Sequence, residues 1–371
     1  MNTAASPPLT VEVPPEPPDL HGLPNGVDLL TRLEGISADR GLDSLAKRLA
    51  DLAVFVGGDL AALEDQIARL PRYPHAVGRG ATHLLDLGGK RLRPTCVVLA
   101  ARLGAGFDAR ALDLAVAVEL VHTATLLHDD VVDLSETRRG VATARATYGN
   151  AVSIFAGDWV LIEALRRVGR CGMPGLLDDL LATIEEMIFA ESLQLENRGR
   201  INTDRDAYFR VIEGKTAALF RWAMRAGGMA GGLGEAECRA LQSYGIHLGI
   251  AFQAIDDLLD FAGKTSFTGK ELFADLREGK MTYPVILALE RDPDLRPVLE
   301  QVVTAPGNHA LPEQAAARVI ASLRETRALD DCLELARERS ARAVAELSCL
   351  PPGRAAWALA TVAEAIVDRD L

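Results

Sequence analysis

The sequence lacks several features, and each absence excludes a class of protein. Lys and Arg number 40 against 52 Asp and Glu, a formal net charge of −12, so the basic surface that nucleic-acid binding requires is missing. Charges such as Glu119, Asp158 and Glu163 interrupt the long apolar stretches, and no segment is predicted to span a membrane. The five cysteines have no CxxC spacing, and such an odd, unpatterned set indicates reduced thiols in a cytoplasm.

The composition is that of a soluble globular protein with a sizeable core, at 49% hydrophobic and 25% charged residues. Its 371 residues have room for one large domain or two ordinary ones. The first 26 residues differ, because they hold seven of the 18 prolines and neither Lys nor Arg. We predict residues 1–30 to be a Pro-rich disordered arm, with neither the basic start of a secretory signal nor the arginines of a transit peptide.

The remainder, residues 31–371, is predicted to form a single all-α domain. Between Pro94 and Pro284 the only proline is Pro174, and apolar residues recur three and four positions apart. Alternation typical of strands is not evident. Breaks between helices are predicted where Gly and Pro gather, at 171–175, 227–234, 304–312 and 351–353.

One predicted helix carries a pair of carboxylates within an apolar run. Asp129 and Asp133 are four residues apart and therefore project from one face of that helix, and His122 lies near the same face two turns earlier. Hard oxygen ligands at this spacing suit Mg²⁺. An ordinary acidic surface is the alternative, although the apolar neighbours argue against free solvation.

A second helix repeats the pattern far along the chain. Asp256 and Asp260 have the same four-residue spacing, Gln253 lies on the same side, and the neighbours are again apolar. Either pair alone is compatible with chance. Two such pairs together predict facing helices that share metal ions.

Basic residues near these pairs are candidates for binding phosphate. Lys90 and Arg93 stand where a glycine loop enters a helix, whose free N–H groups favour anions. Arg138 and Arg139 follow the first pair, and on a helix they would point about 100° apart, toward two different phosphates. A basic helix start on the surface is the plainer alternative for the first group.

Two further basic sites lie near the second pair. Gly214-Lys215-Thr216 resembles the end of a phosphate-binding P-loop, but Phe209 stands where that loop needs glycine, so the P-loop reading is rejected. Lys215 is instead expected to reach a phosphate from within a helix. The connection at 263–271, which includes Lys270, is either a lid over bound phosphate or a surface loop.

Taken together, these motifs resemble those of the trans-isoprenyl (polyprenyl) diphosphate synthases. The matching runs are GGKRLRP at 88–94, HTATLLHDDVVD at 122–133, RRG at 138–140, GKT at 214–216, FQAIDDLLD at 252–260 and DLREGKMTYP at 275–284. Their order and spacing are those of the family, and only the N-terminal arm falls outside the likeness. The resemblance implies a helical bundle of the isoprenoid-synthase type around a central apolar cavity, Mg²⁺ as cofactor, and a homodimer.

The resemblance also implies three groups of binding residues. The diphosphate of isopentenyl diphosphate would be held by Lys90, Arg93, His122 and Arg139. The diphosphate of the allylic substrate would be held by Arg138, Lys215, Thr216, Gln253 and Lys270. The Mg²⁺ ions that bridge the allylic diphosphate would be bound by Asp129, Asp133, Asp256 and Asp260. Four of these residues are expected to act in catalysis: Asp129, Asp133, Lys215 and Asp256.

The implied reaction is Mg²⁺-dependent condensation of an allylic diphosphate with isopentenyl diphosphate into a longer trans chain. Ala124 and Thr125, one turn before Asp129, are small and leave room for a product of at least C20. A terpene cyclase would lack GGKRLRP and carry an Asn/Ser/Glu metal triad in place of the second pair. A non-catalytic subunit of a heteromeric synthase would have lost one aspartate pair, and both pairs are intact here.

Overall fold

The structure is a computed structural model, which describes residues 26–39, 42–262, 272–303 and 312–368. The helices of the first half are α1 (Gly26–Asp39), α2 (Asp43–Ala68), α3 (Ala76–Asp86), α4 (Leu92–Arg102), α5 (Ala109–Val132), α6 (Ala144–Tyr148), α7 (Asn150–Arg170), α8 (Leu176–Asn197) and α9 (Arg205–Ile212). Those of the second half are the π-helix η1 (Glu213–Ala217), α10 (Ala218–Ala230), α11 (Glu235–Ala262), α13 (Ala274–Arg277), α14 (Tyr283–Arg291), η2 (Pro293–Leu295), α15 (Arg296–Val303), α16 (Glu313–Glu325), α17 (Ala328–Glu346), η3 (Leu347–Cys349) and α18 (Arg354–Asp368).

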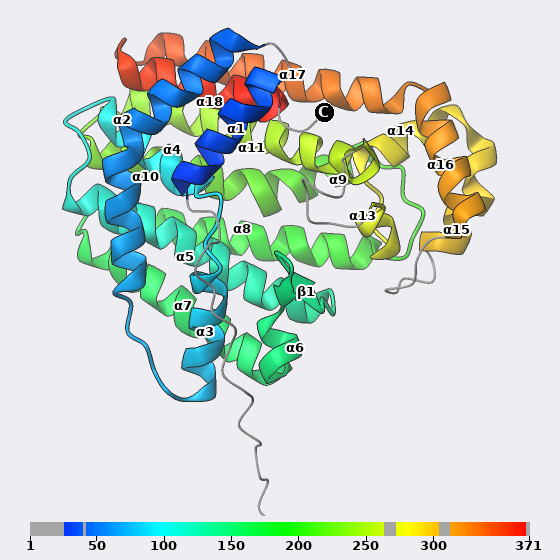
Figure 1. Ribbon diagram of the computed structural model, residues 1–371, viewed down its shortest axis with the longest axis horizontal. Helices are drawn as coiled ribbons and strands as arrows, with labels where there is room; N and C mark the ends of the chain where they lie inside the picture. The colour runs from blue at the N-terminus through cyan, green and yellow to red at the C-terminus, as the bar shows by residue number, and fades with distance from the viewer. Residues whose placement is uncertain (1–25, 40–41, 263–271, 304–311, 369–371) are drawn as a thin grey trace, which may run out of the picture.

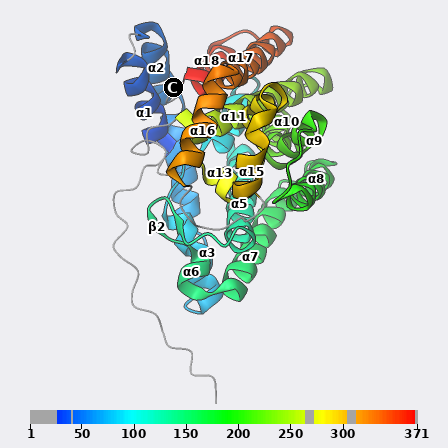
Figure 2. The same ribbon diagram turned by 90° about the vertical axis from the view of Figure 1, so that its right-hand side faces the viewer.

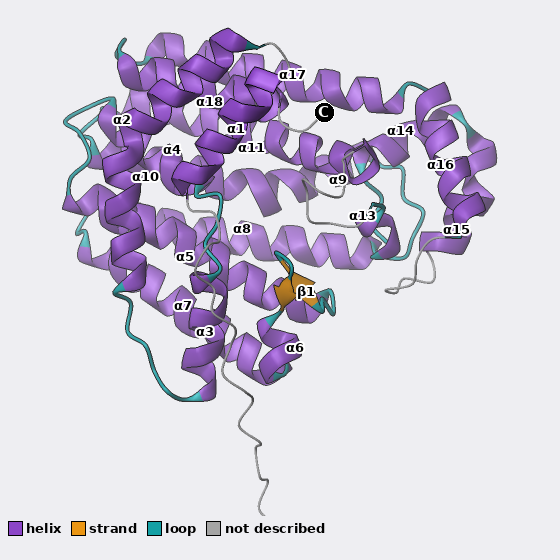
Figure 3. Cartoon of the chain, viewed as in Figure 1, coloured by secondary structure: helices purple, strands orange, loops and turns teal. Residues whose placement is uncertain are grey.

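Helices dominate the described chain, as Figure 3 shows, and the predicted all-α class is confirmed. The only strands within the described ranges are β1 (Thr137–Arg138) and β2 (Val141–Ala142), which pair as a short antiparallel hairpin. The hairpin corrects one detail, since Arg138 and Arg139 do not lie on a helix. Arg139 has a φ of 54° and Gly140 a φ of 80°, so this tight turn, rather than helical geometry, separates the two arginines.

The predicted breaks agree with the structure where it can be compared. Residues 171–175 separate α7 from α8, the glycine-rich turn after Ala230 separates α10 from α11, and residues 351–353 precede α18. The break at 304–312 lies almost wholly outside the described residues. Helix α1 begins at Gly26, so residues 26–30 of the predicted arm are helical, and residues 1–25 are not described.

The centre of the bundle is α5, which packs against α4, α7 and α10 (Figure 1). Its buried residues lie on every side of the helix, as expected for a helix enclosed by others. Among the described helices, α5 alone is long and apolar enough to cross a membrane. Of its most apolar window 67% is buried inside the protein, which is typical of a core helix, and this makes it weak evidence for a span.

The second long helix of the core, α11, packs against α10 and α17. Gly249 of α11 lies directly against Ala217. A Cβ atom on Gly249 would lie 2.5 Å from Cα of Ala217, so only glycine permits this approach. This approach brings the π-helix η1 against α11. Figure 2 views the molecule from the end formed by α15 and α16, with α7 and α8 along one side and α1 and α2 along the other. The fold thus fixes α5, α8, η1 and α11 around one interior space.

Candidate active site

A single large cavity of about 1630 Å³ collects most of the predicted site residues. Both acidic helices, α5 and α11, contribute to its walls, together with the β1–β2 hairpin, α8, η1 and the segment 274–282. The predicted residues that line it are Arg93, His122, Asp129, Asp133, Arg138, Arg139, Lys215, Thr216, Gln253 and Asp256. Two described members of the predicted set, Lys90 and Asp260, do not line it, and Lys270 lies outside the described residues.

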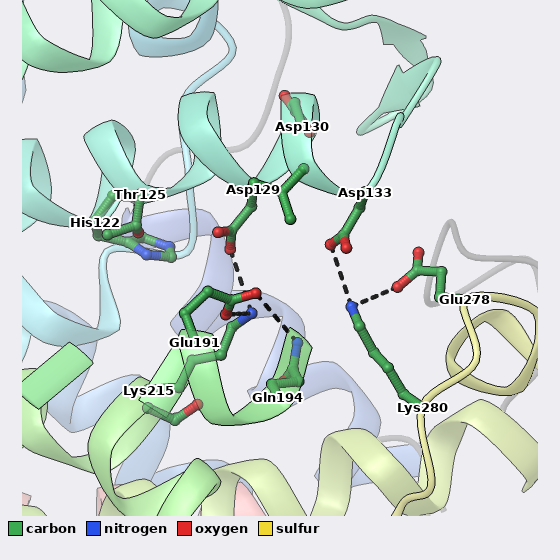
Figure 4. A network of polar contacts seen from close by, with 12 residues as sticks. His122, Thr125, Asp129, Asp130, Asp133, Glu191, Gln194, Lys215, Glu278 and Lys280 are labelled. Atoms are coloured by element: carbon green, nitrogen blue, oxygen red, sulfur yellow. Dashed lines mark hydrogen bonds and ion pairs between the residues drawn. The ribbon is translucent and has the colours of Figure 1, made fainter. Parts of the chain in front are cut away.

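The carboxylates at the C-terminal end of α5 are paired with cations from three other parts of the chain, of which Figure 4 shows Lys215 and Lys280. Lys215 Nζ lies 3.6 Å from Asp129 Oδ2 and also pairs with Glu191 of α8. Lys280 Nζ lies 3.2 Å from Asp133 Oδ2 and 2.6 Å from Glu278 Oε2. Arg198 lies 3.2 Å from the other oxygen, Asp133 Oδ1. Lysine and arginine side chains of the protein therefore form ion pairs with both Asp129 and Asp133.

Electrostatics at this pair reflect burial among like charges. Burial raises the pKa of Asp129, and the nearby Glu191 and Asp133 raise it further, against the opposing effect of Lys215. Burial lowers the pKa of Lys280, but Glu278 and Asp133 overcome that effect and raise it overall, so this lysine stays charged. A further positive charge beside Asp129 would therefore favour its ionised form.

Lys215 owes its position to an irregularity in its helix. It lies in η1, a π-helical turn, and such turns occur often at functional sites. Gly214 allows α8 to approach, since a Cβ atom there would lie 2.6 Å from Ala190 Cβ. Lys215 therefore lies between α8 and α5, where it forms ion pairs with Glu191 and Asp129.

On α11, the buried carboxylate of Asp257 is held by hydrogen bonds from neutral side chains. Asp257 accepts hydrogen bonds from Tyr208 Oη (2.7 Å) and Gln253 Nε2 (2.8 Å), and Gln253 Oε1 accepts one from Thr216 (2.9 Å). Burial, with Asp275 and Asp256 nearby, raises the pKa of Asp257 to about 7, although the two donors lower it. Asp256 is half-buried at the cavity wall.

Asp260, predicted as a metal ligand, has a different use in the fold. Its carboxylate accepts hydrogen bonds from the backbone N–H groups of Ala274 (2.8 Å) and Asp275 (3.3 Å). These are the first two residues of α13, so Asp260 caps that helix from α11 and complements its dipole. The side chain is 7% exposed.

The basic residues at the opposite wall surround a position suited to an anion. The Arg93 guanidinium stacks over Phe220, 4.6 Å from the ring centroid, and its Nε is buried without a hydrogen-bond partner in the described chain. Burial lowers the pKa of His122 well below its usual value, and the neighbouring Arg93 and Arg139 lower it further. Arg138 is instead ion-paired with Asp130, at 2.7 Å.

The arginine between Lys90 and Arg93 has a structural role. Arg91 has a φ of 49°, is 3% exposed and pairs with Glu64 (2.8 Å) and Glu119 (2.6 Å). These ion pairs fix the loop at the start of α4 and leave Arg93 to face the cavity. Lys90 is exposed on the same loop.

The arrangement fits magnesium held jointly with a phosphate ligand. Among the described residues no group of three or more His, Cys, Asp or Glu side chains is close enough to hold a metal ion alone. Mg²⁺ usually takes one or two carboxylates together with waters and substrate phosphates, rather than an all-protein cage. Asp129 and Asp133 on one wall and Asp256 on another, with cationic groups between them, match that donor set.

Sequence reasoning missed several residues of the cavity. Glu191, Arg198, Tyr208 and Asp257 have no distinctive spacing, because they enter the site from α8, its C-terminal end, α9 and the inner side of α11. Asp257 adjoins Asp256, but the four-residue spacing of the acidic pair does not include it. Lys280 lies in the run at 275–284, and no local spacing relates it to Asp133.

Comparisons with known proteins identify the family of this chain. The profile of the polyprenyl synthetase family matches residues 75–319. The octaprenyl diphosphate synthase of Haemophilus influenzae is 37% identical over 295 residues, which cover 79% of this chain and 88% of that enzyme. Heptaprenyl diphosphate synthase component 2 of Geobacillus stearothermophilus is 34% identical over 324 residues, covering 87% and 99%.

The fold is shared as well. The crystal structure of a polyprenyl synthase from Caulobacter crescentus, complexed with calcium and isoprenyl diphosphate, matches with a TM-score of 0.80 at 35% identity, over 86% of this chain and 97% of that one. Fold and relatives together define an all-helical transferase of the isoprenoid-synthase type. The chain belongs to the polyprenyl synthetase family.

Proposed function

We propose that this transferase condenses an allylic diphosphate with isopentenyl diphosphate, in a Mg²⁺-dependent reaction, into an all-trans polyprenyl diphosphate of C20 or longer. The observation that carries the proposal is the meeting of both aspartate helices in one cavity, with Asp129, Asp133 and Asp256 on its walls. The names of the relatives, octaprenyl and heptaprenyl diphosphate synthase, support the reaction class.

In this proposal the two ends of the cavity bind different diphosphates. The allylic diphosphate lies between α5 and α11, where it meets Lys215, Thr216, Gln253 and Arg138, and Lys270 joins from the segment that is not described. Isopentenyl diphosphate lies near the start of α4, where Arg93, His122 and Arg139 line the cavity and Lys90 lies on the adjoining loop. The Nε of Arg93, which is buried and has no hydrogen-bond partner among the described residues, supports an anion at that position.

The residues of the cavity would stabilise the leaving diphosphate, orient the isopentenyl double bond and exclude water. Magnesium held by Asp129, Asp133, Asp256 and Asp260 would neutralise the allylic diphosphate and make it a better leaving group. Asp260 would have to share its oxygens with the α13 backbone. Lys215 and Arg138 add fixed positive charge toward the same group, and the second diphosphate pocket orients the isopentenyl double bond for attack. The apolar lining, which includes Leu161 and Met187, excludes water from the allylic cation.

The length of the product depends on space beyond the diphosphate. Ala124 and Thr125 both line the cavity one turn before Asp129, and Ala124 is 1% exposed. Their small side chains support a product of C20 or longer. Ala124→Phe should shorten the product, as read by mass spectrometry of reactions primed with dimethylallyl, farnesyl or geranylgeranyl diphosphate, and an unchanged product length would contradict this assignment.

The purified chain tests the activity directly. Radiolabel from isopentenyl diphosphate should enter extended prenyl diphosphates when Mg²⁺ is present, and should not after chelation of the metal. Asp129→Asn is the inactive control. Cyclic hydrocarbons formed without isopentenyl incorporation would indicate a terpene cyclase, and activity only in the presence of a second protein would indicate a subunit of a heteromeric synthase.

We also propose that the enzyme is a homodimer and acts in a cytoplasm. Support for self-association comes from α7 and α8, which contact each other and expose large apolar side chains such as Phe155 (59%) and Phe189 (65%). Support for a reducing compartment comes from the cysteines, all five of which are unpaired. Sedimentation at micromolar concentration should give twice the chain mass, and Phe189→Glu should reduce it to one.

A further inference from the structure

Arg198 connects three parts of the active site. It is the residue directly after α8, and its Nε donates to the backbone oxygen of Glu278 at 2.7 Å. One guanidinium nitrogen, Nη1, donates to the backbone oxygen of Val132 and to Asp133 Oδ1, each at 3.2 Å. The C-terminal ends of α5 and α8 are thereby joined to the turn that carries Lys280.

The backbone beside Arg198 holds the same turn. Gly199 N–H donates to the oxygen of Gly279 at 2.9 Å, and a Cβ atom on Gly279 would lie 2.9 Å from Gly199 N. Gly279 also has a φ of 78°, a conformation that glycine adopts without strain. The position of Lys280 therefore depends on the segment that Arg198 begins.

The two cations on Asp133 differ in how firmly they are held. Two of the three Arg198 contacts are to backbone carbonyls, so this side chain stays in place whether or not Asp133 is engaged elsewhere. Lys280 ends in a single ammonium group and has a second partner, Glu278 Oε2, at 2.6 Å. Lys280 therefore has a partner besides Asp133 in Glu278, and Arg198 has two backbone carbonyls.

We propose that Arg198 is a positioning residue that holds Asp133 Oδ1 and so presents Oδ2 to a Mg²⁺ ion on the bound diphosphate, while Lys280 occupies Oδ2 until the ion arrives. The inference rests on the proposed function, because it assumes that Asp133 is a metal ligand. Arg198, which lies on neither aspartate helix, would then support the metal site by orienting one of its ligands. Residues that orient a metal ligand in this way typically change metal affinity by about tenfold to a hundredfold when lost.

The test is a titration with Mn²⁺ in the presence of inorganic pyrophosphate, followed by the electron paramagnetic resonance signal of the free ion. Arg198→Met should weaken Mn²⁺ binding by about tenfold or more. Arg198→Lys, which keeps one cation but not the planar fork, should fall between Met and wild type. The matched control is Arg200→Met, two residues on and exposed, which should bind as wild type does.

A double-mutant cycle separates positioning from a general structural role. If Arg198 acts through Asp133, then adding Arg198→Met to Asp133→Asn should weaken Mn²⁺ binding no further than Asp133→Asn alone. In activity assays the Mg²⁺ concentration for half-maximal rate should rise, with kcat at saturating Mg²⁺ within about threefold of wild type.

Each outcome bears on the claim. Unchanged Mn²⁺ binding in both Arg198 variants, or full additivity in the double mutant, would overturn the role of Arg198 and leave the proposed function intact. Absence of Mn²⁺ binding by the wild type with pyrophosphate would overturn both. Should Arg198→Met fail to fold, as judged by circular dichroism, the Arg198→Lys titration and its own cycle with Asp133→Asn decide the question.

Discussion

The two aspartate pairs share one spacing in sequence but are built into the protein in different ways. On α5, Asp129 and Asp133 face the cavity and are neutralised by lysine and arginine side chains from other elements. On α11, Asp256 is the member of the predicted pair that lines the cavity, whereas Asp260 caps α13. The neighbouring Asp257 is buried among neutral hydrogen-bond donors. Equal spacing thus places carboxylates on a face, whereas tertiary partners decide which oxygens remain available to a ligand.

The largest effect is expected at the first pair. Asp129→Asn should lower kcat/KM by about a thousandfold or more, equivalent to about 4 kcal/mol, because the metal-bound diphosphate loses a ligand. Since burial disfavours the charge of Asp129, replacing it by a neutral amide should not lower the free energy of unfolding. Steady-state kinetics and urea denaturation measure the two quantities, and a large loss of stability would make the first pair structural.

Within the second helix, the next effect is a pH dependence of stability at Asp257. Its pKa is raised to about 7 from 3.8, so the protonated form favours the fold and this contribution is lost as the pH rises through 7. Asp257→Asn should therefore gain stability relative to wild type as the pH rises from 5 to about 7, by up to about 3 kcal/mol, with little further change up to pH 9. Denaturation in urea across this pH range, without metal, provides the measurement. A constant difference between the two proteins would show that Asp257 does not titrate in this range.

A smaller effect is expected at Asp260. Asp260→Ala removes the acceptor for the first two N–H groups of α13 and should cost about 1–2 kcal/mol of stability. Asp260→Asn keeps one oxygen and should recover part of that loss. Thermal unfolding of both variants tests the cap. If both keep wild-type stability but lose Mn²⁺ binding, Asp260 is a ligand first and a cap second.

The smallest effect concerns a single hydroxyl. Tyr208→Phe deletes one donor to Asp257, and because that donor lowers the pKa of the carboxyl group, the pKa should rise further. At about 1.4 kcal/mol per pH unit, the loss of one hydrogen bond should shift the pH dependence of stability caused by Asp257 upward by about one unit. Urea denaturation of Tyr208→Phe across the same pH range measures the shift, and an unchanged pH dependence would show that Tyr208 does not stabilise the ionised Asp257.

Local patterns were sufficient for the helical class, both aspartate pairs and most of the basic residues, because helical spacing alone determines which side chains share a face. They were insufficient where partners come from distant segments. Arg138 and Arg139 were assigned to a helix, and a positive φ at Arg139 forms a hairpin turn instead. Lys280 and Arg198 reach Asp133 through the docking of Gly279 on Gly199, a contact between residues 80 positions apart that no periodicity encodes.

The account depends most on both acidic helices binding metal on the same diphosphate. Anomalous diffraction from crystals soaked with Mn²⁺ and inorganic pyrophosphate measures this directly. We expect manganese peaks within about 2.0–2.4 Å of carboxylate oxygens on both Asp129 and Asp256, with a single pyrophosphate bridging the ions. Manganese confined to one helix, or bound outside the cavity, would contradict the account.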